Sequence, residues 1–252
     1  MFRERLGAAS PVGTWVSLSD PAVAEMTAPG FDFVVLDTEH APNADATVAN
    51  AVRAVEAADG DAVPLARPLD NDRGRIKRLL DVGVAGVMVP LVETPEGAAR
   101  AVSAAKYPPD GERGVAATRA SGYGRRLDEY VANANDDTLV IVQIETEHGL
   151  ANVDAIAATD GVDALFVGPA DLSANLGVFS EFDGDRFREA VDAVLDACSA
   201  ADVPVGTLAT SEDGVERYTA WGFDYVIAGT DIGHLQRGAA RMREMAREGL
   251  QR

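Results

Sequence analysis

The sequence predicts one (β/α)8 barrel of the TIM type, in the α/β class, from its length, its apolar pattern and the number of repeating units. The 252 residues match the roughly 250 that such a barrel uses as a single domain. Eight short runs rich in Val and Ile each precede a longer amphipathic stretch. Runs that are apolar at nearly every position are typical of parallel strands buried on both faces. Eight strand–helix units are the number that closes a barrel.

The expected elements alternate along the chain. The first helix is expected to begin at Pro21, because Asp20 supplies an N-cap and proline suits the first helical turn. The strands are predicted at 13–19, 31–39, 62–68, 86–91, 139–146, 163–169, 204–209 and 224–230. The later helices are predicted at 45–58, 71–83, 94–107, 151–159, 185–201, 211–222 and 231–249.

The connection at 108–137 is much longer than the others and contains a short helical piece at 127–136. Connections above about 12–15 residues are usually functional or disordered. No linker or low-complexity segment divides the chain, so residues 1–252 are expected to form one domain. A doubly wound open sheet is the alternative. It normally shows a glycine-rich phosphate loop after its first strand, and the segment WVSLSDPAV has none.

The composition excludes several classes of protein. The chain has 22 Lys and Arg against 41 Asp and Glu, a formal net charge of −19, so nucleic acid is not an expected partner. No window approaches the roughly 18 apolar residues of a membrane span, and the start MFRERLGAAS lacks the apolar core of a secretory signal. We therefore expect a cytoplasmic protein whose acidic, solvated surface resembles that of proteins from salt-loving cells. Cys198 is the only cysteine, which excludes intrachain disulfides.

Polar residues stand at the ends of expected strands, where the active-site residues of a barrel lie. They are Asp37-Thr38-Glu39-His40, Arg67, the run from Gln143 to His148, and Gly168-Pro169-Ala170-Asp171. Glu145 and Asp171 end neighbouring strands, and two close carboxylates repel each other unless a proton or a cation lies between them. Oxygen ligands with open positions suit Mg²⁺ or Mn²⁺. The alternative is that each carboxylate caps a helix or pairs with an arginine.

His40 and Arg67 are the candidate acid–base and anion-binding residues. The pKa of a histidine suits proton transfer at neutral pH, and Asp37, three residues earlier, is a possible partner that orients the ring. A guanidinium directly after an apolar run is a candidate clamp for an oxyanion. The alternative for Arg67 is an inner-barrel ion pair, for example with Glu145.

Covalent catalysis is disfavoured by what the sequence lacks. Schiff-base chemistry needs a lysine at the catalytic end of the barrel. The only lysines are Lys77, inside RIKRLLDVG, and Lys106, at the end of the next helix. There is no GxSxG segment and no Walker loop. Metal-assisted acid–base chemistry is the expectation that remains.

Six segments carry a known pattern: FDFVVLDTEHAPN, LARP, IKRLLDVGVAGVMVPLVET, YPPDGERG, VQIET and GPADLS. In this order and spacing, from about Gly13 to about Gly238, they resemble the HpcH/HpaI aldolase family. That family comprises metal-dependent class II pyruvate aldolases of the pyruvate/phosphoenolpyruvate barrel superfamily. Thr38 stands where the family usually has glycine, and Glu147-His148 also departs from the family pattern. These departures concern the aldehyde end of the substrate.

The resemblance implies a role for each matching residue. Glu145 and Asp171 would hold Mg²⁺, Mn²⁺ or Co²⁺, and Arg67 would stabilise the enolate oxygen. His40 would be the base. The remaining contacts to substrate would come from Gln143 and from Gly168, Pro169, Ala170 and Asp171 at the pyruvate, and from Leu208 near the aldehyde.

The family also implicates an aspartate that matches Asp81 in raising the basicity of the histidine. The strand assignment puts Asp81 before the fourth strand, at the opposite end of its own barrel. It can therefore reach His40 only from a neighbouring subunit. Asp37 and Asp81 remain rival partners of His40.

The activity that the resemblance implies is cleavage of the C3–C4 bond of a 4-hydroxy-2-oxoacid to pyruvate and an aldehyde, and the reverse addition. Two alternatives stay open. One is cleavage of an acyl-CoA, as in citrate or malyl-CoA lyases, which the sparse lysines disfavour because a CoA tail needs positive charge. The other is a non-catalytic, metal-stabilised oligomer that keeps the pyruvate pocket.

The resemblance also implies a homohexamer, a trimer of dimers, with the helix at 231–249 packing across a subunit boundary. This helix carries an apolar stripe with methionines, which suits an interface: Leu235, Ala239, Met242, Met245 and Ala246. The alternative is that the stripe covers the helix's own barrel.

Overall fold

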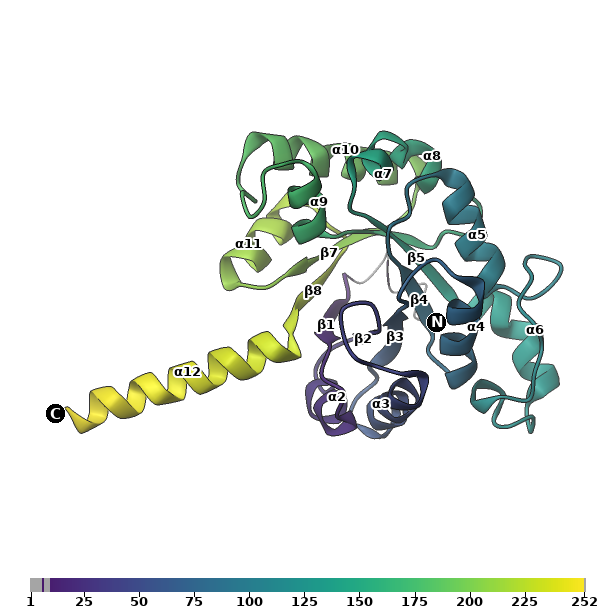
Figure 1. Ribbon diagram of the computed structural model, residues 1–252, viewed down its shortest axis with the longest axis horizontal. Helices are drawn as coiled ribbons and strands as arrows, with labels where there is room; N and C mark the ends of the chain where they lie inside the picture. Colours follow the sequence, from purple (N-terminus) through teal and green to yellow (C-terminus); the bar gives the residue numbers. More distant parts are fainter. Residues whose placement is uncertain (1–5, 7–9, 252) are drawn as a thin grey trace.

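The computed structural model describes residues 6 and 10–251 and shows a closed barrel of eight parallel strands in sequence order, with β8 pairing with β1 (Figure 1). The strands are β1 (Val12–Val16), β2 (Phe33–Asp37), β3 (Val63–Arg67), β4 (Gly86–Val89), β5 (Leu139–Ile144), β6 (Ala164–Val167), β7 (Val205–Ala209) and β8 (Tyr225–Thr230). Seven of them lie within runs that the sequence predicts as strands, and β1 begins at Val12, one residue before its predicted run at 13–19. The predicted fold class is confirmed.

Helices surround the barrel and differ from expectation in two places. They are α2 (Pro21–Thr27), α3 (Asp45–Ala57), α4 (Arg73–Val82), α5 (Pro95–Ala105), α6 (Leu127–Asp137), α7 (Glu147–Ala151), α8 (Val153–Ala157), α9 (Pro169–Asn175), α10 (Asp185–Ala201), α11 (Glu212–Trp221) and α12 (Asp231–Leu250), with a 3₁₀ turn η1 (Arg119–Ser121). The helix predicted at 151–159 is confirmed over α8, and the prediction omitted α7, which ends at Ala151 and is separated from α8 by Asn152. The prediction also omitted α9, whose seven residues begin at Pro169, because the pair Gly168-Pro169 has the composition of a turn.

The first predicted cap is confirmed. The Asp20 carboxylate accepts a hydrogen bond of 2.9 Å from the N–H of Ala22, and Pro21 occupies the first turn of α2. The aspartate satisfies a backbone donor that the helix itself leaves unpaired, and proline has no N–H to satisfy. This cap fixes where the chain turns after β1.

Large side chains fill the inside of the barrel, and small residues on neighbouring strands make room for them. Gly13 pairs in register with Phe33, and a Cβ on Gly13 would lie 2.3 Å from the Phe33 ring. Gly206 pairs with Tyr225, and a Cβ there would lie 2.1 Å from that ring. The filled interior makes the barrel a packed core rather than a pore, so the reacting groups must lie at its rim.

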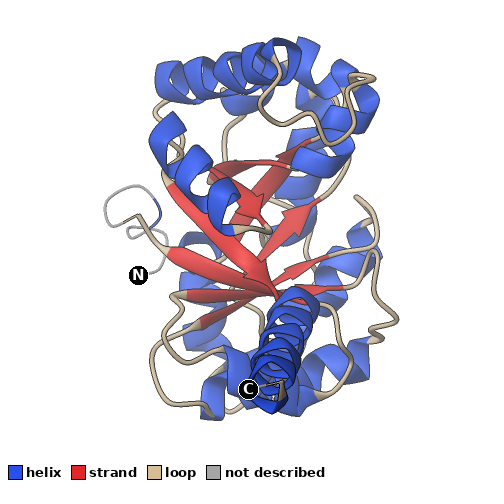
Figure 2. Cartoon of the chain, turned by 90° about the vertical axis from the view of Figure 1, so that its left-hand side faces the viewer, coloured by secondary structure: helices blue, strands red, loops and turns tan. Residues whose placement is uncertain are grey.

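The C-terminal helix α12 leaves the barrel instead of covering it. Figure 1 shows it extending away from the strands, and Figure 2 shows it nearly end-on, pointing toward the viewer. Every residue from Leu235 to Gln251 is exposed, with Leu235 and Met242 each 66% exposed. The alternative in which the apolar stripe covers its own barrel is therefore wrong. Among the described residues, no helix has the length and apolar character needed to cross a membrane.

Candidate active site

The carboxyl ends of β2, β3, β5 and β6 bring most of the sequence-predicted residues to one rim of the barrel. Asp37 is the last residue of β2 and pairs in register with Arg67, the last residue of β3. On the other side, Glu145 follows β5 directly and Gly168 follows β6. We call this rim the mouth. Its two halves, the β2–β3 side and the β5–β6 side, differ in whether their carboxylates are ion-paired.

On the β2–β3 side, Arg67 is held by two carboxylates. Its Nε and Nη2 donate hydrogen bonds of 2.9 and 2.8 Å to the two oxygens of Asp37, and its Nη1 forms a 2.7 Å ion pair with Glu39. The guanidinium also stacks on Trp15, with its carbon 4.6 Å from the ring centroid. Burial alone would raise the pKa of Asp37, but the hydrogen bonds and charge of Arg67 outweigh it and hold that pKa below its usual value.

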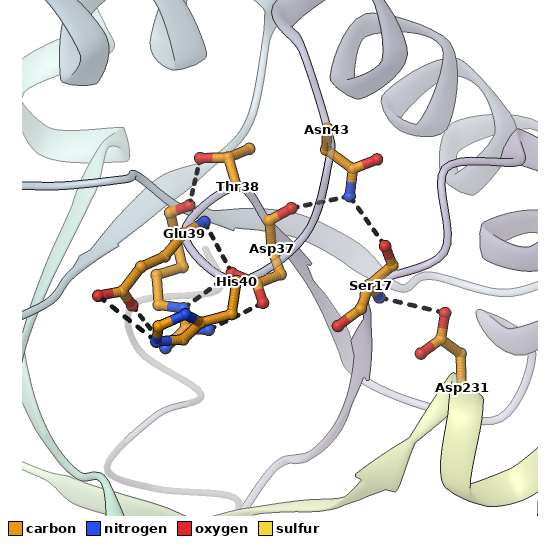
Figure 3. A network of polar contacts seen from close by, with 8 residues as sticks. Ser17, Asp37, Thr38, Glu39, His40, Asn43 and Asp231 are labelled. Carbon is orange, nitrogen blue, oxygen red and sulfur yellow. Dashed lines mark hydrogen bonds and ion pairs between the residues drawn. The ribbon is translucent and has the colours of Figure 1, made fainter. Parts of the chain in front are cut away.

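The loop after β2 is fastened to its neighbours, as Figure 3 shows. The Asn43 amide donates to the carbonyl of Asp37 at 2.8 Å and to that of Ser17 at 3.3 Å. The Thr38 hydroxyl donates to the carbonyl of Arg67 at 2.7 Å. These bonds fix the segment that carries Glu39 and His40.

His40 lies at the edge of this network. Its side chain is 69% exposed, and its Nε2 is 3.9 Å from an oxygen of Glu39. Within the described residues, no contact joins His40 to Asp37, whose two oxygens are bound by Arg67 and by the N–H of Glu39. The carboxylate beside His40 in this chain is thus Glu39. Glu39 has no predicted role of its own, although it directly precedes the predicted base His40 in the sequence.

On the β5–β6 side, Glu145 and Asp171 form no ion pair with an arginine within the described residues. Glu145 is buried, and its Oε1 accepts a 2.6 Å hydrogen bond from the N–H of Leu91. Burial raises the pKa of Glu145 to about 7; the Leu91 hydrogen bond opposes this rise, and the charges of Asp171 and Glu39 add to it. Asp171 is exposed at the start of α9. Asp171 thus lies near enough for its charge to raise the pKa of Glu145, and the binding of a metal by this pair stays a prediction.

Two further features of this side suit a bound cation. The Gln143 side chain is buried, and its Oε1 has no hydrogen-bond partner within residues 6 and 10–251. A Cβ on Gly168 would lie 2.8 Å from Glu145 Oε2 and 3.2 Å from Glu145 Cβ, so the glycine lets the chain pass close to this carboxylate. No group of three or more His, Cys, Asp or Glu side chains in the described chain has the geometry to hold a metal ion. The chain offers two carboxylates, and Mg²⁺ is commonly bound by one or two carboxylates together with water and substrate oxygens.

The residues expected at the substrate lie around this centre. Gly168 and Pro169 are buried, and Ala170 is exposed beside them. Pro169, Ala170 and Leu208 line a small cavity of about 100 Å³ between α9 and α11. Leu208 is half-buried near the end of β7. Three of the residues expected at the substrate, Pro169, Ala170 and Leu208, thus share one cavity.

Asp81 lies elsewhere, as the sequence analysis expected. It stands near the end of α4, ahead of β4, and accepts a 3.1 Å hydrogen bond from Arg113. Arg113 is buried, with its guanidinium over the rings of Tyr107 and Tyr130 at 4.7 and 5.7 Å. Asp81 thus has a cationic partner inside its own chain, at the end of the barrel opposite the mouth.

The comparisons with known proteins agree with this geometry. The model of the HpcH/HpaI aldolase/citrate lyase family matches residues 12–237. The chain belongs to this family. It is 40% identical over 223 residues to a 5-keto-4-deoxy-D-glucarate aldolase of Shigella dysenteriae, covering 88% of this chain and 86% of the relative. It is 39% identical over 241 residues to a hydroxypyruvate/pyruvate aldolase of Chromohalobacter salexigens, covering 94% of each.

A solved structure supports the same family assignment. The crystal structure of an HpcH/HpaI aldolase/citrate lyase family protein from Burkholderia cenocepacia matches with a TM-score of 0.94 and 37% identity, covering 98% of both chains. The resemblance read from the six sequence segments is confirmed. The expected enzyme class, a carbon–carbon lyase of the aldolase type, is also confirmed.

Proposed function

We propose that the β5–β6 side of the mouth binds a divalent cation and a 2-oxoacid, and that this centre cleaves 4-hydroxy-2-oxoacids to pyruvate and an aldehyde. The observation that carries the proposal is the buried Glu145, whose charge has Asp171 as a neighbour and no guanidinium bound to it. When Mg²⁺, Mn²⁺ or Co²⁺ is bound there, it supplies Lewis-acid stabilisation of the enolate that bond cleavage produces.

The other residues of the mouth have roles that follow from their positions. Arg67 has five N–H groups, and its contacts to Asp37 and Glu39 leave donors for a developing enolate oxygen. Because both carboxylates fix the guanidinium, it needs no reorganisation as charge develops. His40 is exposed at the rim, where it takes the proton of the substrate 4-hydroxyl directly or through one water. Glu39 and Asp81 are rival groups for supporting its basicity: Glu39 from the same chain and Asp81 from a neighbouring one.

The pyruvate half would lie against Gln143 and the Gly168-Pro169-Ala170-Asp171 backbone. The Gln143 Oε1, buried without a hydrogen-bond partner in the described structure, supports a polar occupant. Leu208 would border the aldehyde half. The two named relatives act on a sugar-acid substrate and on hydroxypyruvate or pyruvate, so we propose polar hydroxylated aldehydes as the second product.

Release of pyruvate decides the reaction type. A panel of 4-hydroxy-2-oxoacids that includes 5-keto-4-deoxy-D-glucarate should release pyruvate, measured with a coupled dehydrogenase. Acyl-CoA thioesters such as malyl-CoA form the second arm. Cleavage of thioesters alone would favour the lyase alternative. No product in either arm, although pyruvate binds, would favour a binding protein.

We also propose that the chain assembles as a hexamer, a trimer of dimers, through α12. The exposed stripe on α12 lacks a covering surface in its own chain, while Val12 on the outer side of β1 is 41% exposed and Ala228 on β8 is only half-buried. The α12 of a second copy would cover this flank. Because the net charge is −19, assembly should weaken at low ionic strength.

Light scattering in molar salt tests the assembly. The expected result is a hexameric mass that falls in the variant Leu235→Lys/Met242→Lys. A monomeric mass with full aldolase activity would contradict both the hexamer and any role of Asp81 from a neighbouring subunit.

A further inference from the structure

A cavity of about 510 Å³ opens at the end of the barrel opposite the mouth. Val84 and Ala85, which lead into β4, and Thr138, which leads into β5, lie at its base. Helices α3 and α6 and the turn η1 contribute its walls. Its volume falls within the roughly 300–1,000 Å³ of small-molecule pockets.

Arginines gather in this cavity although the whole chain is strongly acidic. Arg53, Arg119, Arg125 and Arg126 line it, in a chain whose formal net charge is −19. Its acidic lining residues are Glu56 and Asp137. Glu56 is ion-paired with Arg119 and so does not neutralise the other guanidiniums.

Arg125 and Arg126 converge on the same side of the turn that follows η1. A Cβ on Gly122 would lie 3.6 Å from Nε of Arg126 and 3.9 Å from Nε of Arg125. Gly122 has a φ of 64°, in the left-handed region, and this conformation lets the chain turn so that both side chains reach the cavity. Both residues are exposed, and within the described part of the chain neither side chain forms an ion pair or a hydrogen bond with another residue. Adjacent like charges repel, and an anion placed between them removes that repulsion.

The other two arginines are held in place by hydrogen bonds and, for Arg119, also by the ion pair with Glu56. Arg53 donates hydrogen bonds of 2.7 Å to the Asn50 side chain and 3.2 Å to the Tyr123 hydroxyl. Arg119 donates one of 2.9 Å to the carbonyl of Val82, beside Gly83. The cavity therefore has two oriented guanidiniums and two without partners.

We propose that this cavity binds a small molecule carrying oxyanion groups, either a phosphate ester or a polycarboxylate, through Arg125 and Arg126. The planar fork of a guanidinium matches both kinds of oxyanion with paired hydrogen bonds. Glu145 stands at the other end of β5 from Thr138. A ligand in the cavity is thus an effector or a structural anion and not a second substrate, and this proposal is independent of the proposed reaction.

Calorimetric titration of the full chain, stripped of metal and held at constant ionic strength with NaCl, tests the proposal. Inorganic pyrophosphate is the phosphate probe and tricarballylate is the polycarboxylate probe, so the two arms separate the two ligand classes. At least one probe should bind saturably to the wild type, and Arg125→Gln/Arg126→Gln should weaken that binding by about tenfold or more. Arg53→Gln should weaken it by less, because that guanidinium is already hydrogen-bonded.

The matched control is Arg75→Gln/Arg100→Gln, which removes the same charge from two exposed arginines outside the cavity. It should leave probe affinity within about twofold, because screened distant charges contribute little. Absence of binding by both probes, or equal weakening by the control pair, overturns the proposal. So does a fall in particle mass on Arg125→Gln/Arg126→Gln without probe binding to the wild type, because the arginines would then contact a second copy. Thermal unfolding checks that each variant is folded.

Discussion

The two halves of the mouth bury similar acidic groups but treat them differently. On the β2–β3 side, Asp37 and Glu39 share one guanidinium, so each carboxylate meets positive charge supplied by the chain. On the β5–β6 side, Glu145 accepts one backbone hydrogen bond and has no ion pair within the described residues. Burial and the charges of Asp171 and Glu39 raise its pKa, and the charge of Arg67 opposes them only in part. A protein keeps a buried, uncompensated carboxylate at a cost in stability, and such groups concentrate at functional sites. From this contrast we infer that the β2–β3 side holds Arg67 in position and that the β5–β6 side binds the cation.

The largest expected effect is on the β5–β6 side. Glu145→Gln should lower turnover by roughly 10³-fold or more, because it removes a charged oxygen ligand that the proposed cation requires. In the metal-free protein the same change should raise stability. The folded-state pKa of about 7 lies above the ordinary glutamate value of 4.5, so Glu145 contributes stability at low pH that is lost as pH rises toward 7.

That gain should be about 1–3 kcal/mol at pH 8 and close to zero at pH 4. Urea unfolding of the wild type and the variant at the two pH values measures it. A Glu145→Gln protein that is both active and no more stable than the wild type at pH 8 would contradict the inference that the β5–β6 side binds the cation through Glu145.

The next effect concerns His40, which lies beside the β2–β3 side. His40→Ala should lower kcat by roughly 10²–10⁴-fold and leave pyruvate and metal binding largely intact. Steady-state kinetics together with calorimetry separate the two. If His40→Ala keeps near wild-type kcat, the base lies elsewhere, with His148 as the next candidate.

Asp37→Asn tests the β2–β3 side and should change stability in the opposite direction to Glu145→Gln. It leaves the buried Arg67 with Glu39 as its only carboxylate and should cost about 3 kcal/mol at neutral pH. The loss should shrink in acid, because the depressed pKa of Asp37 means that its contribution disappears as pH falls through that pKa. Chemical unfolding measures it.

The matched control for Asp37→Asn is Asp192→Asn, which breaks a partly exposed ion pair with Arg188. It should change stability by less than about 0.5 kcal/mol. Equal decreases in the free energy of unfolding of the two variants would show that Asp37 stabilises the fold no more than an exposed ion-paired aspartate does.

The smallest expected effect is the pH dependence of metal binding. A metal must displace the proton of Glu145, so its affinity should fall as pH drops below about 7. The slope should approach about tenfold per pH unit if one proton is released, and it should flatten above about pH 8. Calorimetry in buffers of different ionisation enthalpy counts the released protons. An affinity independent of pH between 5 and 8 would place the metal on other ligands.

The fold and the strand-end residues were predictable because each depends on local sequence. Apolar runs predict the strands, and the polar residues at the end of each run are expected at the rim of the barrel. This reasoning identified Asp37, Arg67, Glu145 and Asp171 as candidate site residues. The partner of Arg67 was not predictable, since it depends on the register of β2 against β3, which sets Asp37 opposite Arg67. The sequence analysis offered Glu145 as an ion-pair partner, whereas the ion pairs of Arg67 are with Asp37 and Glu39.

Helix α12 shows a second limit of the sequence. Its apolar periodicity is the same whether the stripe covers its own barrel or another surface. Only the direction in which the chain leaves β8 separates the two, and this direction is a tertiary property (Figure 1). The arginine cavity is a third case, because its residues come from segments between 53 and 138 and no local pattern unites them.

The most direct test of the account is turnover before and after exhaustive chelation, with metal then restored. The account predicts that pyruvate release from a 4-hydroxy-2-oxoacid stops in the chelated protein and returns with Mg²⁺, Mn²⁺ or Co²⁺, and that Glu145→Gln is not rescued. Full turnover in the presence of chelator, or borohydride trapping of pyruvate on Lys77 or Lys106, would contradict it.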